Sequence, residues 1–145
     1  MTTAFEDLTD ALVASLMASP CLAEGNVWAN RVRVIPQGCH TAIVVRIERS
    51  PGREEVLGML DWDSHFAIEV YGRSASGEDP AKVVGALLQA VWARFCTIDP
   101  SALNAMGFNL NPSIQWQFDE LESPLACATF FLSVLHRTPA NSLSA

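Results

Sequence analysis

Hydrophobic and polar positions change rhythm several times along this chain, and each change predicts a new structural element. Apolar residues recur at helical spacing near the amino terminus, where Thr3 and Glu6 stand at the spacing of a capping box. We expect a first helix there, and we expect it to end near Ser19. The reason is Pro20, because a proline disfavours the α conformation in the residue before it.

Alternation of apolar and polar residues predicts five strands. They cover residues 27–35, residues 41–49, the segment around Phe66, Ile68 and Val70, the segment from Ile114 through Trp116 to Phe118, and residues 126–136. Pro36, Gln37 and Gly38 form a turn between the first two strands. We therefore expect those two strands to make a hairpin.

A second helix is predicted between the third and fourth strands. Asp79 suits the N-cap position and Pro80 the first helical position, a preferred combination. Asp99 and Pro100 repeat this signal at a short helical turn. The order α-β-β-β-α-β-β predicts an α+β fold, with a mostly antiparallel five-stranded sheet packed by two main helices. Residues 1–137 are predicted to form one domain, and residues 138–145 a flexible tail.

The segment of residues 54–63 shows neither the helical spacing nor the strand alternation of apolar residues. It mixes apolar residues with acidic ones and is too apolar for a free loop. We expect it to fold back on its own sheet or to lie against a neighbouring protein.

Composition narrows the functional classes. The chain has 145 residues, of which half are hydrophobic, and a formal net charge of −7 with Lys82 as its one lysine. Sequence-specific binding to nucleic acid and adhesion to anionic membranes are disfavoured, since both use clustered Lys and Arg. We expect neither a signal peptide nor a membrane span. The four cysteines have no Cys-x-x-Cys spacing and suit reduced thiols in the cytoplasm.

Candidate chemistry is sparse. Asp61, Asp63 and His65 alternate, so on a strand they would share one face and could meet a metal. The preferred interpretation is a solvated strand edge, because no further ligand is evident. Cys39-His40 and His136 belong to no recognisable motif. We therefore predict no enzymatic activity, no catalytic residue, no resident metal and no cofactor.

The four tryptophans raise a separate question, because exposed aromatic side chains are common at protein interfaces. Trp92 and Trp116 lie on faces predicted to pack in the core. Trp28 and Trp62 flank turns and are better candidates for contact with a partner protein.

The order of elements resembles the tail-terminator family of long-tailed bacteriophages, also called minor tail protein U. The opening helix and five further segments carry the resemblance: residues 41–45, 66–71, 98–103, 119–120 and 128–134. The likeness spans nearly the whole chain but depends on pattern, not on a diagnostic motif. The apolar segment from Val56 to Trp62 departs from the family pattern.

This resemblance implies a structural protein, encoded by a phage or a prophage, that forms a closed and typically hexameric ring. The ring would cap the tail tube and join it to the head-tail connector protein, first in the bacterial cytoplasm and then in the virion tail. Cyclic rings need two different surface patches that meet. The residues we expect in that interface are Arg53, Val56, Leu57, Leu60, Trp62 and Trp28.

Two alternatives remain open at this stage. One is a different cytoplasmic protein-interaction module, or a neck or tail-completion protein, on a related fold. The other is a metal-dependent enzyme built on Asp61, Asp63 and His65.

Overall fold

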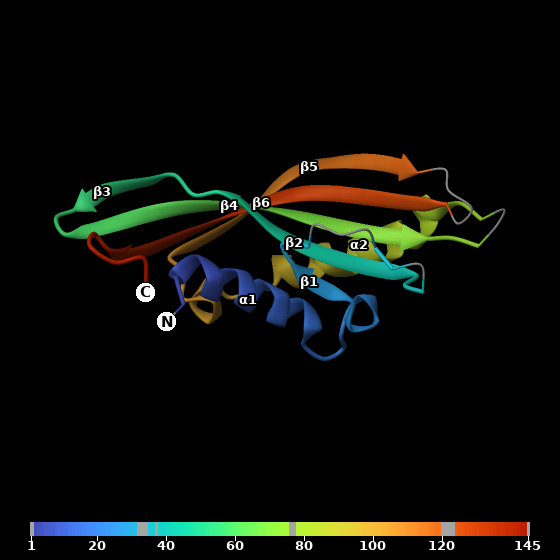
Figure 1. Cartoon of the computed structure of the whole chain (residues 1–145), viewed down its shortest axis with the longest axis horizontal. Coiled ribbons are helices and arrows are strands. Elements are labelled where there is room, and N and C mark those ends of the chain that lie inside the picture. The colour runs from blue at the N-terminus through green and yellow to red at the C-terminus, as the bar shows by residue number, and fades with distance from the viewer. Residues whose placement is uncertain (1, 32–34, 37, 76–77, 120–123, 145) are drawn as a thin grey trace.

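The computed structural model describes residues 2–31, 35–36, 38–75, 78–119 and 124–144. Within these residues, two helices and a six-stranded sheet form an α+β fold, as the sequence predicts (Figure 1). The helices are α1 (Ala4–Met17) and α2 (Pro80–Cys96), with short 3-10 turns η1 (Ala23–Gly25) and η2 (Pro100–Leu103). The strands are β1 (Val27–Ala29), β2 (Thr41–Arg49), β3 (Gly52–Val56), β4 (Met59–Arg73), β5 (Gly107–Asp119) and β6 (Leu125–Pro139).

Both helices begin at the predicted caps. The Glu6 amide donates to Thr3 Oγ1 at 3.2 Å and the Thr3 amide donates to Glu6 Oε2 at 2.7 Å, which completes a capping box. At α2 the Ala81 amide donates to Asp79 Oδ1 at 3.0 Å. These bonds satisfy amides that have no partner inside the helix, so the local sequence alone fixes where each helix starts.

The sheet is mostly antiparallel, as predicted, and β1 with β2 is its parallel pair, but in the described residues it has six strands and not five. Its order is β1-β2-β4-β6-β5, and β3 pairs with β4. The long strands β4 and β6 pair without interruption from Met59 opposite Pro139 to Arg73 opposite Leu125. The additional strand is β3, which overlaps the start of the segment of residues 54–63 that the sequence left undecided.

The predicted hairpin between the first two strands is wrong, because β1 is short and runs parallel to β2. Asn30 has a φ of 49°, and this left-handed conformation turns the chain away after Ala29. The chain then reaches the sheet face opposite the helices, where Ile35 packs against Ala42 and Val44. A parallel pair requires such a crossover. The predicted strand of residues 27–35 is therefore a strand only from Val27 to Ala29, and its residues 32–34 lie outside the described residues.

One hydrophobic core lies between the helices and the sheet. Leu8, Leu12 and Leu16 of α1 and the buried stripe of α2 all pack on the same face of the sheet. Phe66, Ile68 and Val70, which alternation places on one face of β4, meet them there. Alternation therefore grouped the buried residues of this strand correctly.

Beyond this core the sheet continues as a projection that we call the arm. The arm consists of β3, residues 59–62 of β4 and residues 136–139 of β6. Gly58, with a φ of 82°, makes the turn at its tip. Figure 1 shows the arm projecting away from the part of the sheet that α2 covers. The predicted tail boundary at residue 137 is thus displaced, since Thr138 and Pro139 belong to β6 and Thr138 is fully buried.

Candidate interaction surfaces

The edge strand β5 carries an exposed apolar strip formed by Ile114, Trp116 and Phe118. These side chains are 40%, 44% and 60% exposed. They lie opposite Phe130, Ala128 and Ala126 of β6, which belong to the core, so the strip is on the helix side of the sheet. It is exposed because α2 packs over β4 and β6, and the helix layer ends before it covers the second half of β5.

An irregularity in the pairing divides β5 into two halves. The register shifts between Asn111 and Ile114, and two residues are left without partners on β6. Before the shift, Phe108 and Leu110 pack against the core. After it, all residues of β5 are exposed. Trp116 is therefore on the predicted face of the sheet, but the prediction that it packs in the core is wrong, because it is exposed. Trp92 does pack in the core, where its ring meets Phe130 edge to face with ring centroids 5.2 Å apart.

After the irregularity at Pro112 and Ser113, the strip carries no charged side chain to protect this sheet edge. Edge strands are normally short, charged or covered, because their unpaired backbone groups attract other strands. From Gly107 to Phe118 the chain carries no charged residue, in a protein with a net charge of −7. A long, uncharged and apolar edge of this kind is typical of a contact surface with another chain.

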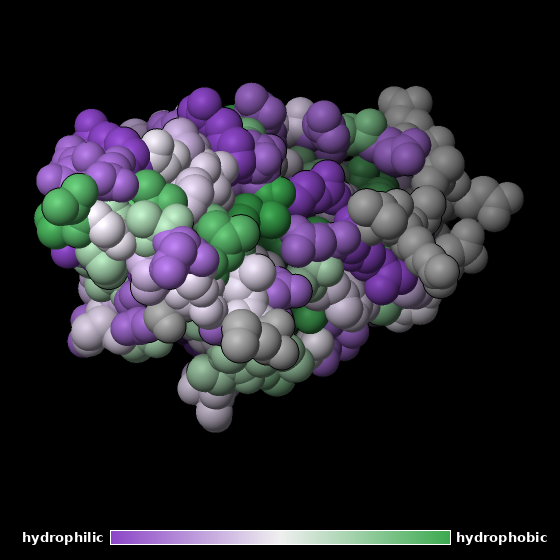
Figure 2. Space-filling model, turned by 60° about the vertical axis from the view of Figure 1, so that its left-hand side comes forward, coloured by the Kyte–Doolittle hydropathy of each residue, from purple (hydrophilic) through white to green (hydrophobic). Residues whose placement is uncertain are grey.

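The tip of the arm is a second exposed apolar surface, formed by Val56 and Leu57. Leu57 is 92% exposed. All residues of β3 are exposed, including Arg53, which forms a salt bridge with Glu55 at 2.9 Å. Figure 2, which brings this end of the molecule forward, shows apolar atoms at the surface among hydrophilic ones.

The base of the arm is braced, in contrast to its tip. Trp62 Nε1 donates to Thr138 Oγ1 at 2.9 Å, and the Trp62 ring meets Phe5 of α1 edge to face with centroids 5.2 Å apart. Beside it, Arg137 Nη2 donates to Asp61 Oδ2 at 3.1 Å and its Nε donates to Oδ1. The hydrogen bonds from Arg137 hold the pKa of the Asp61 carboxyl below its usual value. Trp62 therefore fixes the arm to its own subunit. Leu60, two residues earlier in β4, is half-buried.

The other predicted interface residue, Trp28, lies elsewhere. It packs beside Ile35, Ala42 and Val44 on the face opposite the helices, and the guanidinium of Arg31 lies 4.2 Å from its ring centroid. The predicted interface residues thus divide into three places. Arg53, Val56 and Leu57 are at the exposed end of the arm, Leu60 and Trp62 are partly enclosed by their own subunit, and Trp28 is remote from the arm.

The strip on β5 was missed by sequence reasoning. Its alternation was visible, but alternation reports only which residues share a face. The sequence does not reveal whether a helix covers the strip, because no pattern within β5 shows how far α2 extends across the sheet.

Asp61, Asp63 and His65 share one face of β4, as alternation predicts, but they do not converge on a common point. Asp61 binds Arg137, and His65 Nε2 lies 3.2 Å from Asp63 Oδ2. Among the described residues, no three His, Cys, Asp or Glu side chains are placed to hold a metal ion.

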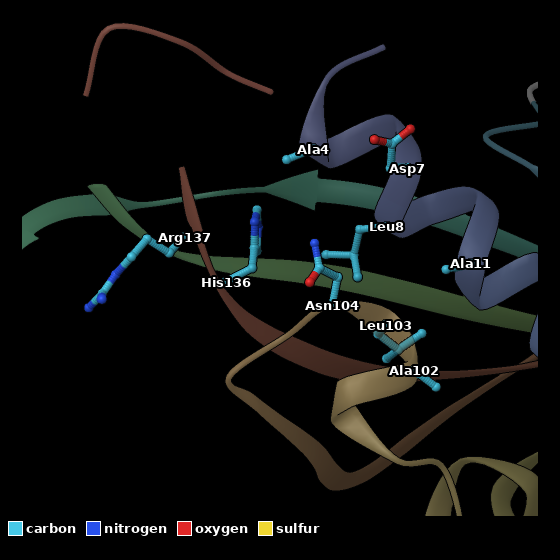
Figure 3. Close-up of a pocket in the computed structure, with 9 residues that line it drawn as sticks. All are labelled: Ala4, Asp7, Leu8, Ala11, Ala102, Leu103, Asn104, His136 and Arg137. Atoms are coloured by element: carbon cyan, nitrogen blue, oxygen red, sulfur yellow. The ribbon is translucent and has the colours of Figure 1, made fainter. Parts of the chain in front are cut away.

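A buried serine and histidine lie at the base of the arm. Ser64 Oγ is 2.7 Å from His136 Nε2 and 2.7 Å from Ser50 Oγ. Burial lowers the pKa of His136, so its ring is neutral at pH 7. His136 also borders a small hollow between α1 and η2 (Figure 3), where Leu8 and Asn104 face the hollow while Asp7 and Arg137 point away from it. Ser64 is fully buried, so this pair acts as an internal packing contact.

Neither α1 nor α2 is both long enough and apolar enough to cross a membrane, and the same holds throughout the described residues.

Comparison with known proteins adds little to these surfaces. No protein-family model matches the chain, and no curated protein matches it. One solved structure, whose name states no function, shares 14% sequence identity over 89% of this chain and 88% of its own, with a TM-score of 0.43. A likeness at that level carries no inference, so any functional argument depends on the geometry of this chain.

Proposed function

We propose that this protein is a structural subunit that works by binding copies of itself and other proteins, as a ring-forming tail terminator of a phage or prophage. The observation that carries this proposal is the arm. Its base is braced by hydrogen bonds and aromatic contacts, while Leu57 at its tip is 92% exposed and contributes nothing to the core of its own subunit. A firmly held projection with an apolar end is suited to insertion into a neighbouring molecule.

The position of the arm supports a ring. Its tip lies where β4 begins at Met59 and β6 ends at Pro139, and the strip of β5 lies opposite residues 126–130 at the other end of β6. The tip and the strip are therefore at opposite ends of the subunit. In the proposed ring, the tip meets a patch on the next copy that differs from both. Contacts between unlike patches build closed rings when the rotation between subunits closes.

In this role the arm supplies one side of the contact between subunits, with Val56, Leu57 and Arg53 at its centre. The faces of the ring bind the tail-tube protein and the head-tail connector protein. The net charge of −7 suits a lumen through which DNA passes without being held, because a negative wall repels phosphate. The subunits assemble in the bacterial cytoplasm and remain in the virion tail.

The test compares two variants with matched chemistry. Leu57→Gln removes the apolar tip, and Met17→Gln makes a similar change at an exposed residue outside the arm. Electron microscopy of the purified proteins, with and without tail tubes, measures ring formation and capping of tube ends. We expect rings and capped tubes from the natural protein and Met17→Gln, and neither from Leu57→Gln.

Rings of unchanged size from Leu57→Gln would remove the arm from the interface. A natural protein that stays monomeric and leaves tubes uncapped would contradict the proposal and favour another kind of interaction module.

A further inference from the structure

The exposed half of β5 has a sequence that is nearly the same read in either direction. From Ile114 to Phe118 it runs Ile-Gln-Trp-Gln-Phe, with Trp116 at the centre. Within the described residues, β5 is an edge of the sheet and these five residues are all exposed, so backbone and side chains are accessible to a second strand. A strand with this symmetry is complementary to an antiparallel copy of itself.

We propose that two copies of this protein pair through β5, antiparallel, about a two-fold axis that passes beside Trp116. In this register Trp116 lies opposite Trp116 of the second copy, and Ile114 lies opposite Phe118. The two sheets then continue across the axis as one. This contact uses a surface other than the arm, so it does not depend on the ring.

The side chains of both faces fit this register. On the helix side, Ile114, Trp116 and Phe118 of both copies form one continuous apolar patch, with aromatic and branched side chains opposite each other, as is favourable across antiparallel strands. On the other face, Gln115 lies opposite Gln117, and their amide groups can each donate and accept. The isologous contact therefore pairs like chemistry with like along its whole length.

The ends of the paired segment are also defined. One step beyond Phe118, Asp119 lies opposite Ser113, so each carboxylate meets a hydroxyl. The two Asp119 side chains stand at opposite ends of the ladder, which avoids a like-charge contact. Pro112 follows Ser113 in the ladder and has no amide hydrogen, so pairing stops there.

The absence of charge from residues 107–118 allows a second copy of this chain to pair with β5 although the two copies repel each other. Two subunits of net charge −7 repel each other, and a stable contact between them must avoid placing acidic groups together. Residues 107–118 provide an uncharged stretch of edge.

The size of the contact predicts its strength. Trp116 and Phe118, at 44% and 60% exposure, together offer roughly 200 Å² of side-chain surface per copy. With Ile114 and the main chain, the pair stays below the range of about 1,200–2,000 Å² typical of stable complexes. We therefore expect a reversible dimer that forms as the concentration rises.

Disulfide trapping tests both the dimer and its register. Ile114→Cys and Phe118→Cys are made separately, each with Cys21→Ser and Cys96→Ser to remove the exposed native thiols. Residues directly opposite on antiparallel strands have Cα atoms about 4.5–5.5 Å apart, within the range of a disulfide. Two Ile114 positions are offset by four residues, about 14 Å along the strand, and so are two Phe118 positions.

The expected result is that a mixture of the two variants forms a crosslinked dimer on mild oxidation, while either variant alone does not. Mass spectrometry of the linked peptides identifies the bridge as 114 to 118. A crosslink formed by one variant alone would place the axis elsewhere and overturn the register. Sedimentation of the natural protein at the same concentration is the second measurement. If the mixture of variants forms no crosslinked dimer and the natural protein sediments as a monomer, the proposal fails.

Discussion

Gly72 of β4 offers a direct test of how closely α2 lies on the sheet. A methyl group at this position would be 2.7 Å from Val84 Cγ2 and 2.9 Å from the backbone nitrogen of Val84. The side-chain contact could be relieved by rotation, but the backbone contact could be relieved only if α2 moved. Gly72→Ala therefore forces the helix away from a core that includes Val84 and Leu88.

The expected cost follows from that geometry. Overpacking in a well-packed core lowers the free energy of unfolding by about 1–3 kcal/mol. For a domain of this size the melting temperature would fall by about 2–4 °C for each kcal/mol. The assay is urea unfolding followed by circular dichroism, with Gly107→Ala as the control, because a methyl group there would lie at an ordinary 3.6 Å from Leu135 Cβ.

We expect Gly107→Ala to change the free energy of unfolding by less than about 1 kcal/mol, since the substitution mainly restricts the unfolded chain. Equal unfolding midpoints for the two alanine variants would refute the close approach of α2 to β4.

Two further predictions concern side chains that join separate elements. Burial lowers the pKa of His136 below its usual 6.5, so the unfolded chain binds a proton more readily than the folded one, and the free energy of unfolding should fall as the pH drops below about 6.5. In urea unfolding between pH 5.5 and 7.5, His136→Gln should make the free energy of unfolding depend less on pH. An unchanged pH dependence in this variant would contradict the prediction. Arg94 donates hydrogen bonds to the backbone carbonyls of Ser15, Ala18 and Pro20 at 2.7–3.1 Å. Arg94→Met keeps the apolar part of the side chain but removes these bonds, so it should lower the free energy of unfolding by about 1–2 kcal/mol. A free energy of unfolding equal to that of the natural protein would show that water replaces these bonds without loss.

Much of this fold follows from local sequence. The caps at Thr3 and Asp79 locate the helices because a side-chain oxygen is needed where amides lack partners. Phe66, Ile68 and Val70 identify the buried face of β4 because period-two alternation assigns sides. These features depend on residues that are close together in the sequence, so a short stretch of sequence is enough to predict each of them.

The remaining features depend on contacts between distant segments. The parallel pairing of β1 was not predictable, since it depends on a left-handed Asn30 and a crossover. The arm was left undecided because β3 is exposed on both faces and shows no alternation of burial. The exposure of Trp116 depends on where α2 ends across the sheet, which is a property of packing and not of the strand.

The central claim is that this protein acts through contacts between protein chains, and sedimentation velocity across a range of concentrations tests it most directly. We predict species heavier than the 15.7 kDa monomer that increase with concentration. A single 15.7 kDa species at every concentration, and equally in the presence of tail tubes, would contradict the claim.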